Sequence, residues 1–359
     1  MAANAVPQYG ICAVQTDSID LELRKRQTPK PASSQVLVRL RACGVCATDL
    51  HLSRRTIPWL QPSVDTGGHE GAGDIVQLGP DVDKTLWNIG DRVAVRWLYS
   101  VCLECELCTT GYENLCSNRR LTGKDVGGCF AQYVVAESKY LNRLPEGVGY
   151  VEAAPILCAG VTVYKALKVA NLRRGSWVVI SGAGGGLGHL GIQYARVMGF
   201  KVVAVDFNKR DFCTELGSEV YIDVTEENLV GQVVKATGGG GHAAIVCASA
   251  GQAYVDAVKY LRKSGTMVCV GVPEKQTQIP VTPEDFIARG IRIVGTSTGS
   301  REDVDEALRY VASKQVKTNL VVRPLEDVDA VLKEIELGRS QGKTVLTIAG
   351  EETSVKGHL

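Results

Sequence analysis

The first third of the chain shows the two-residue periodicity that is typical of half-buried β-strands. Between Val36 and Cys43 the even-numbered positions are Val, Val, Leu and Ala, and the odd-numbered positions include both arginines of this run. Residues 93–97 and 130–135 have a similar character, and Gly, Pro and Asp residues separate these runs. The pattern predicts that the chain begins with a β-rich part.

From Cys158 onward the periodicity changes to helices that alternate with strands. Residues 160–172 have the apolar spacing of a helix, and further helices are predicted at residues 187–198 and 253–261. Short apolar runs predict strands at residues 177–180, 202–205, 244–246, 266–270 and 291–294. This alternation predicts a doubly wound α/β fold, in which helices cover both faces of a parallel sheet.

After Gly295 the segments become shorter, with helices predicted at residues 301–313 and 325–337 and short strands between them. We find no internal repeat, low-complexity linker or heptad run in the sequence. We therefore assign residues 160–296 to a dinucleotide-binding domain. Residues 1–159 and 297–359 are predicted to form one discontinuous domain on either side of it.

Composition and charge exclude several other classes of protein. With 40 basic and 39 acidic residues the formal net charge is +1, which indicates neither a nucleic-acid footprint nor a polybasic membrane surface. The N-terminal residues lack the features of a secretory signal, and the apolar runs are too short to span a bilayer. We therefore expect a cytoplasmic protein, in which the 12 cysteines stay reduced and a cysteine cluster indicates a metal.

One group of cysteines has the spacing of a zinc site. It reads Cys102-x-x-Cys105-x-x-Cys108 and continues, after seven further residues, to Cys116. Four thiolates can surround one Zn²⁺ ion tetrahedrally and leave no position for water or substrate, so the predicted site is structural. The alternative is a set of unrelated, redox-active thiols on a surface loop, and successive three-residue steps argue against it.

A looser pattern combines Cys46 and His69, which are separated by 22 residues. By spacing alone, His69 can be either a turn residue beside glycines or a metal ligand, and the residues leave this open. Three protein ligands and one open position would make a Lewis-acidic zinc, which lowers the pKa of a bound hydroxyl. Oxidation of an alcohol requires the loss of that proton before a hydride can leave the carbon.

The segment after the predicted strand at residues 177–180 indicates a dinucleotide site. Its small residues let the backbone approach a pyrophosphate at the N-terminus of a helix. The small residues are Gly182, Gly184, Gly185, Gly186 and Gly188, and Leu187 is predicted to contact the cofactor with them. The next strand ends at Asp206, which can accept hydrogen bonds from the adenosine ribose and would repel a 2′-phosphate. We therefore predict NAD(H) rather than NADP, although Lys209 and Arg210 add cations that could tolerate a phosphate.

Together these features resemble the medium-chain zinc alcohol dehydrogenases, and most closely their fungal, yeast-type branch. The resemblance extends over residues 36–348, and its most specific motifs are Gly44–His51, Gly68–Gly73, the four-cysteine run and Ala154–Leu167. It implies a Rossmann domain joined to a discontinuous, β-rich GroES-like catalytic domain. It further implies that Cys46, His69 and Cys158 bind a catalytic zinc, so that each chain holds one catalytic and one structural zinc ion.

The resemblance also implies roles for residues around the zinc and the cofactor. Asp49 would accept a hydrogen bond from His69, and Glu70 would lie behind the metal, where it tunes the field or binds the ion transiently. Thr48 would accept the alcohol proton and pass it toward His51 at the surface. Further cofactor contacts are predicted at Val270, Val272, Thr296 and Lys343.

Several positions depart from the pattern of this family. Ala47 stands where relatives carry a basic residue directed at the cofactor pyrophosphate, and Lys343 stands where they carry a second phosphate-binding Arg. Ile57 replaces one pocket tryptophan, Trp97 matches the other, and Val272 replaces a longer side chain. We therefore expect a weaker hold on the cofactor and a substrate bulkier than ethanol. The substrate pocket is predicted at Thr48, Ile57, Trp97 and Val272.

Two alternatives remain open at this stage. A specialised polyol, formaldehyde or secondary-metabolite dehydrogenase would use the same zinc and NAD machinery, and only substrate profiling separates these activities. A non-catalytic NAD(H)-binding sensor would need neither a proton relay nor an open zinc site, so Thr48 and His51 argue against it. The predicted partners are a small-molecule alcohol, aldehyde or ketone and further copies of the chain, because relatives are homodimers or homotetramers.

Overall fold

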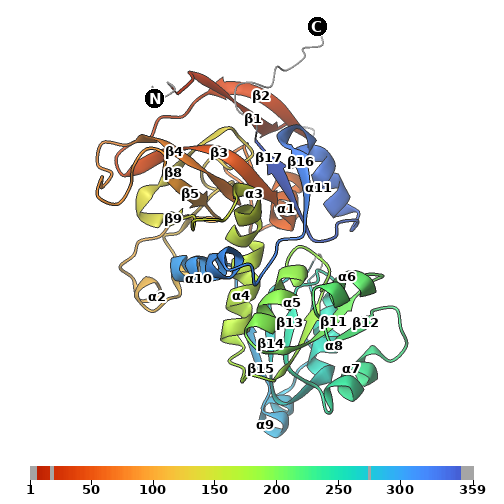
Figure 1. The fold of residues 1–359 in the computed structure, drawn as a ribbon. Coiled ribbons are helices and arrows are strands. Elements are labelled where there is room, and N and C mark those ends of the chain that lie inside the picture. The colour runs from red at the N-terminus through yellow and green to blue at the C-terminus, as the bar shows by residue number, and fades with distance from the viewer. Residues whose placement is uncertain (1–5, 17–19, 274–275, 349–359) are drawn as a thin grey trace. The chain divides into compact units, whose positions relative to one another are not determined.

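The computed structural model describes residues 6–16, 20–273 and 276–348, and the chain divides into two compact units (Figure 1). Unit 1 comprises residues 1–158, 300–312 and 320–359, and unit 2 comprises residues 159–299 and 313–319. Unit 1 is therefore discontinuous in sequence. The domain boundaries predicted after residues 159 and 296 lie close to these divisions, whereas the return of residues 313–319 to unit 2 is not part of the predicted pattern.

Unit 1 is built on a seven-stranded sheet with the strand order β16-β17-β3-β4-β5-β9, and β8 pairs with β3 beside this path. Its strands are β3 (Gln35–Val45), β4 (Gly71–Leu78), β5 (Arg92–Val95), β8 (Tyr133–Glu137), β9 (Asn142–Arg143), β16 (Leu320–Pro324) and β17 (Lys343–Thr347). The pair β17 and β3 joins the end of the chain to its first third in antiparallel register.

Strand β3 confirms the strand predicted from the alternation at residues 36–43, but it is buried on both faces rather than on one. The even-numbered positions of the alternating run are buried, and so are Leu37 and Cys43. A register shift between Leu40 and Ala42 changes the alternation, so that Cys43 joins the core cluster of Val36, Val38 and Leu40. The two arginines of the run reach partial exposure. The strand is covered because α3 (Tyr150–Ala153), η3 (Ala154–Leu157) and α11 (Val328–Glu336) contact it, with α11 packed against the cluster of Val36, Val38 and Leu40.

Smaller elements complete unit 1. Two separate ribbons are formed by β1 (Tyr9–Gln15) with β2 (Leu21–Gln27), and by β6 (Leu98–Ser100) with β7 (Arg120–Leu121). The other helices and 3-10 turns of the unit are α1 (Ala47–Arg54), α2 (Glu106–Thr109), η1 (Glu113–Leu115), η2 (Ser138–Tyr140), α10 (Arg301–Ala312) and η4 (Leu325–Asp327). Helix α1 begins after Cys46, whose backbone N–H donates to the side chain of Asp49 in the first turn.

Unit 2 contains a six-stranded sheet with the order β12-β11-β10-β13-β14-β15, and its neighbouring strands pair in parallel. The strands are β10 (Trp177–Ser181), β11 (Lys201–Asp206), β12 (Val220–Asp223), β13 (Gly241–Val246), β14 (Leu261–Cys269) and β15 (Arg292–Gly295). The helices are α4 (Ala159–Val169), α5 (Gly188–Val197), α6 (Arg210–Glu215), α7 (Leu229–Thr237), α8 (Gly251–Tyr260) and α9 (Pro283–Arg289). The predicted doubly wound α/β architecture is confirmed, and the strand order reverses between β10 and β13.

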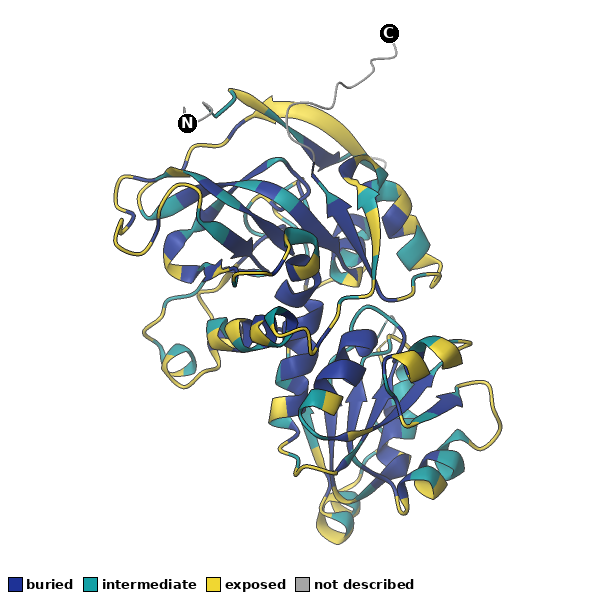
Figure 2. Cartoon of the chain, viewed as in Figure 1, coloured by how far each residue is buried: buried dark blue, intermediate teal, exposed yellow. Residues whose placement is uncertain are grey.

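Burial is concentrated in the sheets of both units, whereas β2 is largely exposed (Figure 2). The central strand β10 begins with a continuous apolar run, residues 177–180, which is typical of a parallel strand that is covered on both faces. Among the described residues, no single helix is long and apolar enough to cross a membrane. One bent pair, residues 150–157 and 159–169, passes that test by length and composition only, and most of its side chains are buried in the fold.

Candidate active site and zinc centres

Four side chains with metal-binding atoms converge in unit 1 although they are distant in sequence. The ligand atoms of Cys46, His69, Glu70 and Cys158 all lie within 4.8 Å of one another. Cys46 precedes α1, His69 and Glu70 precede β4, and Cys158 follows η3, so three separate connections contribute to the cluster. All four residues are buried. The structure therefore brings together the residues that the resemblance implies for the catalytic zinc.

Hydrogen bonding leaves one nitrogen of His69 available to a metal ion. Nδ1 of His69 lies 2.8 Å from Oδ1 of Asp49, which orients the ring and assigns the hydrogen to this nitrogen. Nε2 is buried and has no hydrogen-bond partner within the described part of the chain. The other oxygen of Asp49 accepts the backbone N–H of Cys46 at 2.9 Å. Two thiols and an imidazole with an unpartnered nitrogen fit the donor set that zinc prefers.

Burial and mutual contact shift the pKa values of these groups. The hydrogen bond with Cys158 lowers the pKa of Cys46 well below its usual range, and the same contact and burial raise the pKa of Cys158. Burial disfavours the charged form of His69, but Asp49 and Cys46 together outweigh this effect and raise its pKa well above the usual range. Burial also raises the pKa of Glu70 to about 7. A divalent cation bound here would replace the protons that the cluster otherwise holds.

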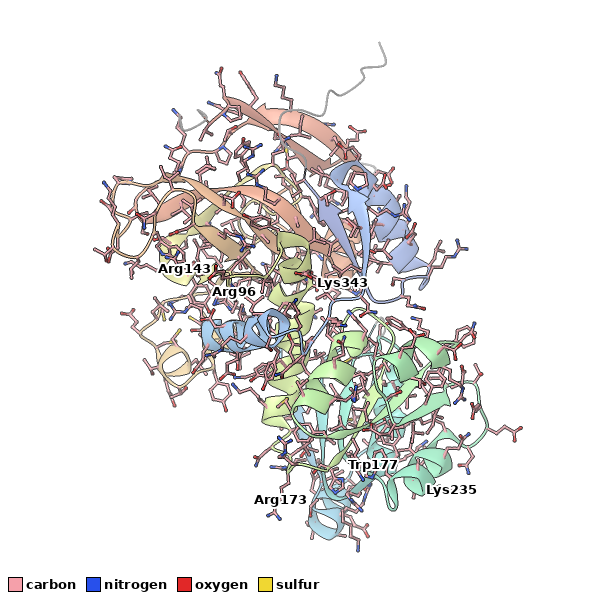
Figure 3. The ribbon with its side chains drawn as sticks, viewed as in Figure 1. Arg96, Arg143, Arg173, Trp177, Lys235 and Lys343 are labelled. Carbon is pink, nitrogen blue, oxygen red and sulfur yellow. The ribbon has the colours of Figure 1, made fainter. Side chains whose placement is uncertain are left out.

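Glu70 pairs with Lys343, the residue predicted to contact a cofactor phosphate. Nζ of Lys343 lies 2.6 Å from Oε1 of Glu70, and both side chains are buried in unit 1, where Figure 3 labels Lys343. The second oxygen of Glu70 lacks a hydrogen-bond partner among the described residues. The lysine thus neutralises a carboxylate beside the predicted zinc ligands, and its contact with a phosphate stays a prediction.

The backbone at Gly44 makes room for that carboxylate. A Cβ atom at position 44 would lie 1.9 Å from Oε2 of Glu70, so no larger residue fits without displacing it. Gly44 is part of the motif that carries the family resemblance, but its role was not predicted. The signal is an isolated glycine inside a strand pattern, which often marks a close approach of another group.

Helix α1 carries the predicted proton relay. Oγ1 of Thr48 lies 3.7 Å from Sγ of Cys46, at the edge of the cluster. His51 follows three residues later, so the two side chains lie on the same side of the helix. Nδ1 of His51 lies 2.8 Å from Oγ1 of Thr56. Both Thr48 and His51 are partly exposed, and Ala47 is exposed. The helix thus places a hydroxyl beside the ligands and a titratable imidazole one turn further along.

Apolar side chains of the predicted substrate pocket lie beside the same cluster. The ring of Trp97 meets that of His69 edge to face, with centroids 4.9 Å apart and an interplanar angle of 68°. Ile57 belongs to a small apolar group with two leucines, and Trp97 packs against this group. Ile57 is 8% exposed, whereas Trp59 is 72% exposed. Trp59 therefore does not fill the space that a tryptophan at position 57 would occupy.

The four-cysteine run forms a second candidate zinc site in unit 1. Its sulfur atoms lie 3.6 Å apart for Cys102 and Cys116, 3.8 Å for Cys102 and Cys108, and 3.9 Å for Cys105 and Cys116. Four sulfurs at about 2.3 Å from a tetrahedral zinc ion lie roughly 3.8 Å from one another. Backbone N–H groups lower the pKa of Cys102 to about 6, which favours its thiolate. The geometry fits a closed, structural zinc site.

In unit 2 the glycine-rich turn joins β10 to α5 where the strand order reverses. The N–H of Gly184 donates to Oδ2 of Asp206 at 2.7 Å, and the N–H of Phe207 donates to Oδ1 at 2.7 Å. Gly182 has a φ of +70°, and a Cβ at Gly188 would lie 2.2 Å from the carbonyl oxygen of Gly182. Both positions therefore require glycine. Such a turn, before a helix and beside a strand-end carboxylate, fits a dinucleotide.

The two cations near Asp206 already have partners in unit 2. Nζ of Lys209 lies 3.9 Å from Oδ1 of Asp206. The guanidinium of Arg210 pairs with Glu226 at 3.2 Å and lies over the ring of Tyr221, 4.9 Å from its centroid. These contacts offset the positive charge that could attract a 2′-phosphate, so they favour NAD over NADP.

The other predicted cofactor contacts lie at the carboxyl edge of the same sheet. Val270 directly follows β14 and Thr296 directly follows β15, and the N–H of Thr296 donates to the carbonyl oxygen of Cys269 at 3.2 Å. Val272 is an exposed residue in the connection after β14. Ligands of open parallel sheets bind at this edge. The individual contacts of these residues with the nicotinamide stay predictions.

Comparisons with known proteins cover both units. Residues 32–146 match the alcohol dehydrogenase GroES-like domain family, and residues 186–313 match the zinc-binding dehydrogenase family. An alcohol dehydrogenase of Geobacillus stearothermophilus is 40% identical over 91% of this chain and 96% of the relative. Alcohol dehydrogenase 2 of Emericella nidulans is 36% identical over 97% of this chain and 100% of the relative. The structure of acetophenone reductase from Geotrichum candidum in complex with NAD has a TM-score of 0.84 at 28% identity, over 96% of this chain and 98% of that one.

The fold and the two cysteine-containing clusters define a zinc-binding dehydrogenase. Because the matches span nearly the whole chain, this chain belongs to the zinc alcohol dehydrogenase family. It is an NAD-dependent enzyme that interconverts alcohols with aldehydes or ketones. The family inferred from its motifs is confirmed, and its place in the fungal branch stays a prediction.

Proposed function

We propose that this enzyme acts on alcohols bulkier than ethanol, or reduces the corresponding aldehydes or ketones. The supporting observation is the composition of the wall beside the zinc ligands. Ile57 is buried next to Trp97, and Trp59 is exposed to solvent, so no indole at position 57 or 59 narrows this wall. The relative named acetophenone reductase shares the fold, and its name describes an aromatic ketone, which supports a wide substrate here.

Replacing Ile57 with tryptophan should shift the preference toward ethanol. An indole at this position would fill space beside Trp97 that a benzylic or secondary alcohol needs. We expect the ratio of kcat/KM for benzyl alcohol to that for ethanol to fall by at least about tenfold. Initial rates of NADH formation with both alcohols measure this ratio, and Trp59→Ala serves as the control because Trp59 is exposed. An unchanged ratio would contradict the role of Ile57.

We propose the following roles for the residues of the site. Cys46, His69 and Cys158 would hold a zinc ion, which would supply the Lewis acidity that favours loss of the alcohol proton, and bound NAD would supply the hydride acceptor. Thr48 would accept that proton at Oγ1 as its own hydroxyl proton passes, through the ribose hydroxyl of a bound cofactor, to His51, which would release a proton to solvent; both residues lie on one side of α1. Asp49 holds the hydrogen on Nδ1 of His69 and so keeps Nε2 free for the metal.

Ala47 is proposed to set the rate of cofactor release. Its side chain is exposed and uncharged, so it contributes no cation to the binding of a pyrophosphate. We expect Ala47→Arg to tighten NADH binding by about fivefold to tenfold, because a charge-assisted hydrogen bond to a phosphate stabilises the complex. Fluorescence titration with NADH measures the change, and Ala47→Gln controls for side-chain length without the charge. Equal affinity in the wild type and Ala47→Arg would refute this assignment.

The remaining functional features follow from the family rather than from the site. We propose a homodimer or homotetramer that works in the cytoplasm, as the family resemblance implies. A specialised dehydrogenase for a polyol, formaldehyde or a secondary metabolite would use the same residues, and the alcohol panel distinguishes these substrates. The partly exposed pair of Thr48 and His51 beside the ligand cluster favours catalysis over a sensor function.

A further inference from the structure

Glu113 is a buried charged residue of the four-cysteine loop, and it has no role among those proposed for the catalytic site. It begins η1 between Cys108 and Cys116, and it is only 5% exposed. A carboxylate removed from water needs hydrogen bonds or opposite charges to compensate for the lost hydration. Thiolate ligands of a zinc ion cannot provide them, and the partners that the structure gives Glu113 come from outside the loop.

Two arginines from distant parts of unit 1 provide that compensation. NH2 of Arg96 lies 3.7 Å from Oε1 of Glu113, and Nε of Arg301 lies 3.9 Å from Oε2. The backbone N–H of Arg301, at the start of α10, donates to Oε1 at 2.7 Å. The ring of Tyr140 lies against both guanidinium groups, with centroid distances of 4.5 and 5.1 Å. Arg96 is buried, so solvent and salt screen this contact little.

Arg96 is followed directly by Trp97, which contacts the predicted zinc ligand His69. The arginine, labelled in Figure 3, belongs to the buried charge cluster, while the tryptophan ring lies 4.9 Å from that of His69. Thr122 holds the same short segment, because its hydroxyl donates to the carbonyl oxygen of Arg96 at 2.7 Å and its N–H donates to that of Trp97 at 2.9 Å. Arg96 and Trp97 are thus neighbours in one short segment, whose backbone Thr122 holds and whose arginine side chain lies in the charge cluster.

We propose that Glu113 is a positioning residue that connects the four-cysteine loop to the substrate wall. Through Arg96 it fixes Trp97 against His69, and through Arg301 it fixes the start of α10 to the same loop. Folding of the loop around its metal ion therefore determines how wide the pocket is beside the catalytic ligands. The effect on substrate choice rests on the function proposed above, whereas the effect on Trp97 does not.

The test compares Glu113→Gln with the wild-type enzyme and with Glu104→Gln, which removes an exposed carboxylate from the same loop. Three quantities are measured: zinc per chain, hydrogen–deuterium exchange of the peptide spanning residues 93–100, and KM and kcat for ethanol and benzyl alcohol. We expect Glu113→Gln to keep both zinc ions and to exchange at least about tenfold faster in this peptide. The ratio of the two KM values should change by at least about fivefold, with a smaller change in kcat. Exchange and KM ratio equal to those of Glu104→Gln would overturn the proposal.

A second variant decides the question if Glu113→Gln does not fold or loses its loop zinc. Arg96→Lys keeps the positive charge and the four cysteines, but it loses the planar group that contacts both Glu113 and Tyr140. Faster exchange at residues 93–100 with both zinc ions present supports the proposal, and wild-type exchange overturns it. Exchange is measured without substrate, so a wild-type enzyme that oxidised neither alcohol would contradict the proposed substrate class and leave this comparison valid.

Discussion

Replacing Cys46 with serine should lower kcat/KM for alcohol oxidation by more than about a thousandfold, while one zinc ion per chain is retained. A serine hydroxyl stays protonated at neutral pH and binds zinc far more weakly than a thiolate does. The other predicted ligands, His69 and Cys158, cannot hold the ion alone, whereas the four-cysteine site does not include Cys46. Elemental analysis of the purified variant together with NADH absorbance measures both effects.

Cys12→Ser is the matched control for this variant. Cys12 is a buried thiol outside both cysteine-containing clusters, and it contacts the carbonyl oxygen of Arg24 through a bond that a serine hydroxyl can also make. We expect this control to retain both zinc ions and near wild-type turnover. If Cys46→Ser kept full activity, or if it lost the zinc of the four-cysteine loop instead, the assignment of the two sites would be wrong.

Thr48→Ala should lower kcat by about a hundredfold to ten-thousandfold with both zinc ions still bound. The variant removes the hydroxyl that lies beside the ligand cluster but leaves Cys46, His69 and Cys158 in place. Thr48→Ser keeps a hydroxyl at the same position, so we expect it to recover most of the lost rate. Steady-state kinetics with a saturating alcohol and a zinc determination separate loss of proton transfer from loss of metal.

A kcat of Thr48→Ala within about threefold of the wild-type value would contradict the proposed relay. His51→Gln provides an independent check, because it should reduce the rate less and the loss should be larger at low pH, where solvent is a poor proton acceptor. If His51→Gln lowered the rate by the same factor at all pH values, His51 would not be part of the relay. The role of Thr48 would be unaffected by that result.

Much of the fold could be predicted from the sequence because its periodicity is local. The apolar runs that became β10, β11, β13 and β14 are short, and the turns between them contain glycine, so the parallel sheet followed from their alternation with helices. The strand β12 and the helix α7 were missed, since their burial depends on neighbouring elements. The return of residues 313–319 to unit 2 also depends on tertiary contacts, which no local pattern encodes.

The two metal sites differ in how far the sequence determines them. Cys102 to Cys116 lie on one loop, so their spacing alone indicated a closed zinc site. Cys46, His69 and Cys158 come from three separate connections, and only the family resemblance related Cys158 to the other two. The structure now places their atoms within 4.8 Å of one another, together with Glu70.

Contacts between buried charged side chains could not be predicted from the sequence. Lys343 is predicted by resemblance to contact a cofactor phosphate, and that contact stays a prediction. The sequence did not reveal its ion pair with Glu70, which directly precedes β4 and lies 2.6 Å from the ammonium group. Nothing in the spacing of the four-cysteine run singles out Glu113, which pairs with Arg96 and Arg301 in the folded chain. Such pairs depend on segments that meet only in the folded chain, so neither periodicity nor spacing reveals them.

The most direct test begins with purified enzyme whose zinc content has been determined. NADH absorbance is then followed with NAD and a panel of primary, secondary and aromatic alcohols. We predict NAD-dependent turnover that disappears on chelation, returns on addition of zinc, and is faster with benzylic or secondary alcohols than with ethanol. A protein that held both zinc ions and bound NADH but turned over none of these alcohols would contradict the proposed activity. A clear preference for ethanol would contradict the wide pocket beside Ile57.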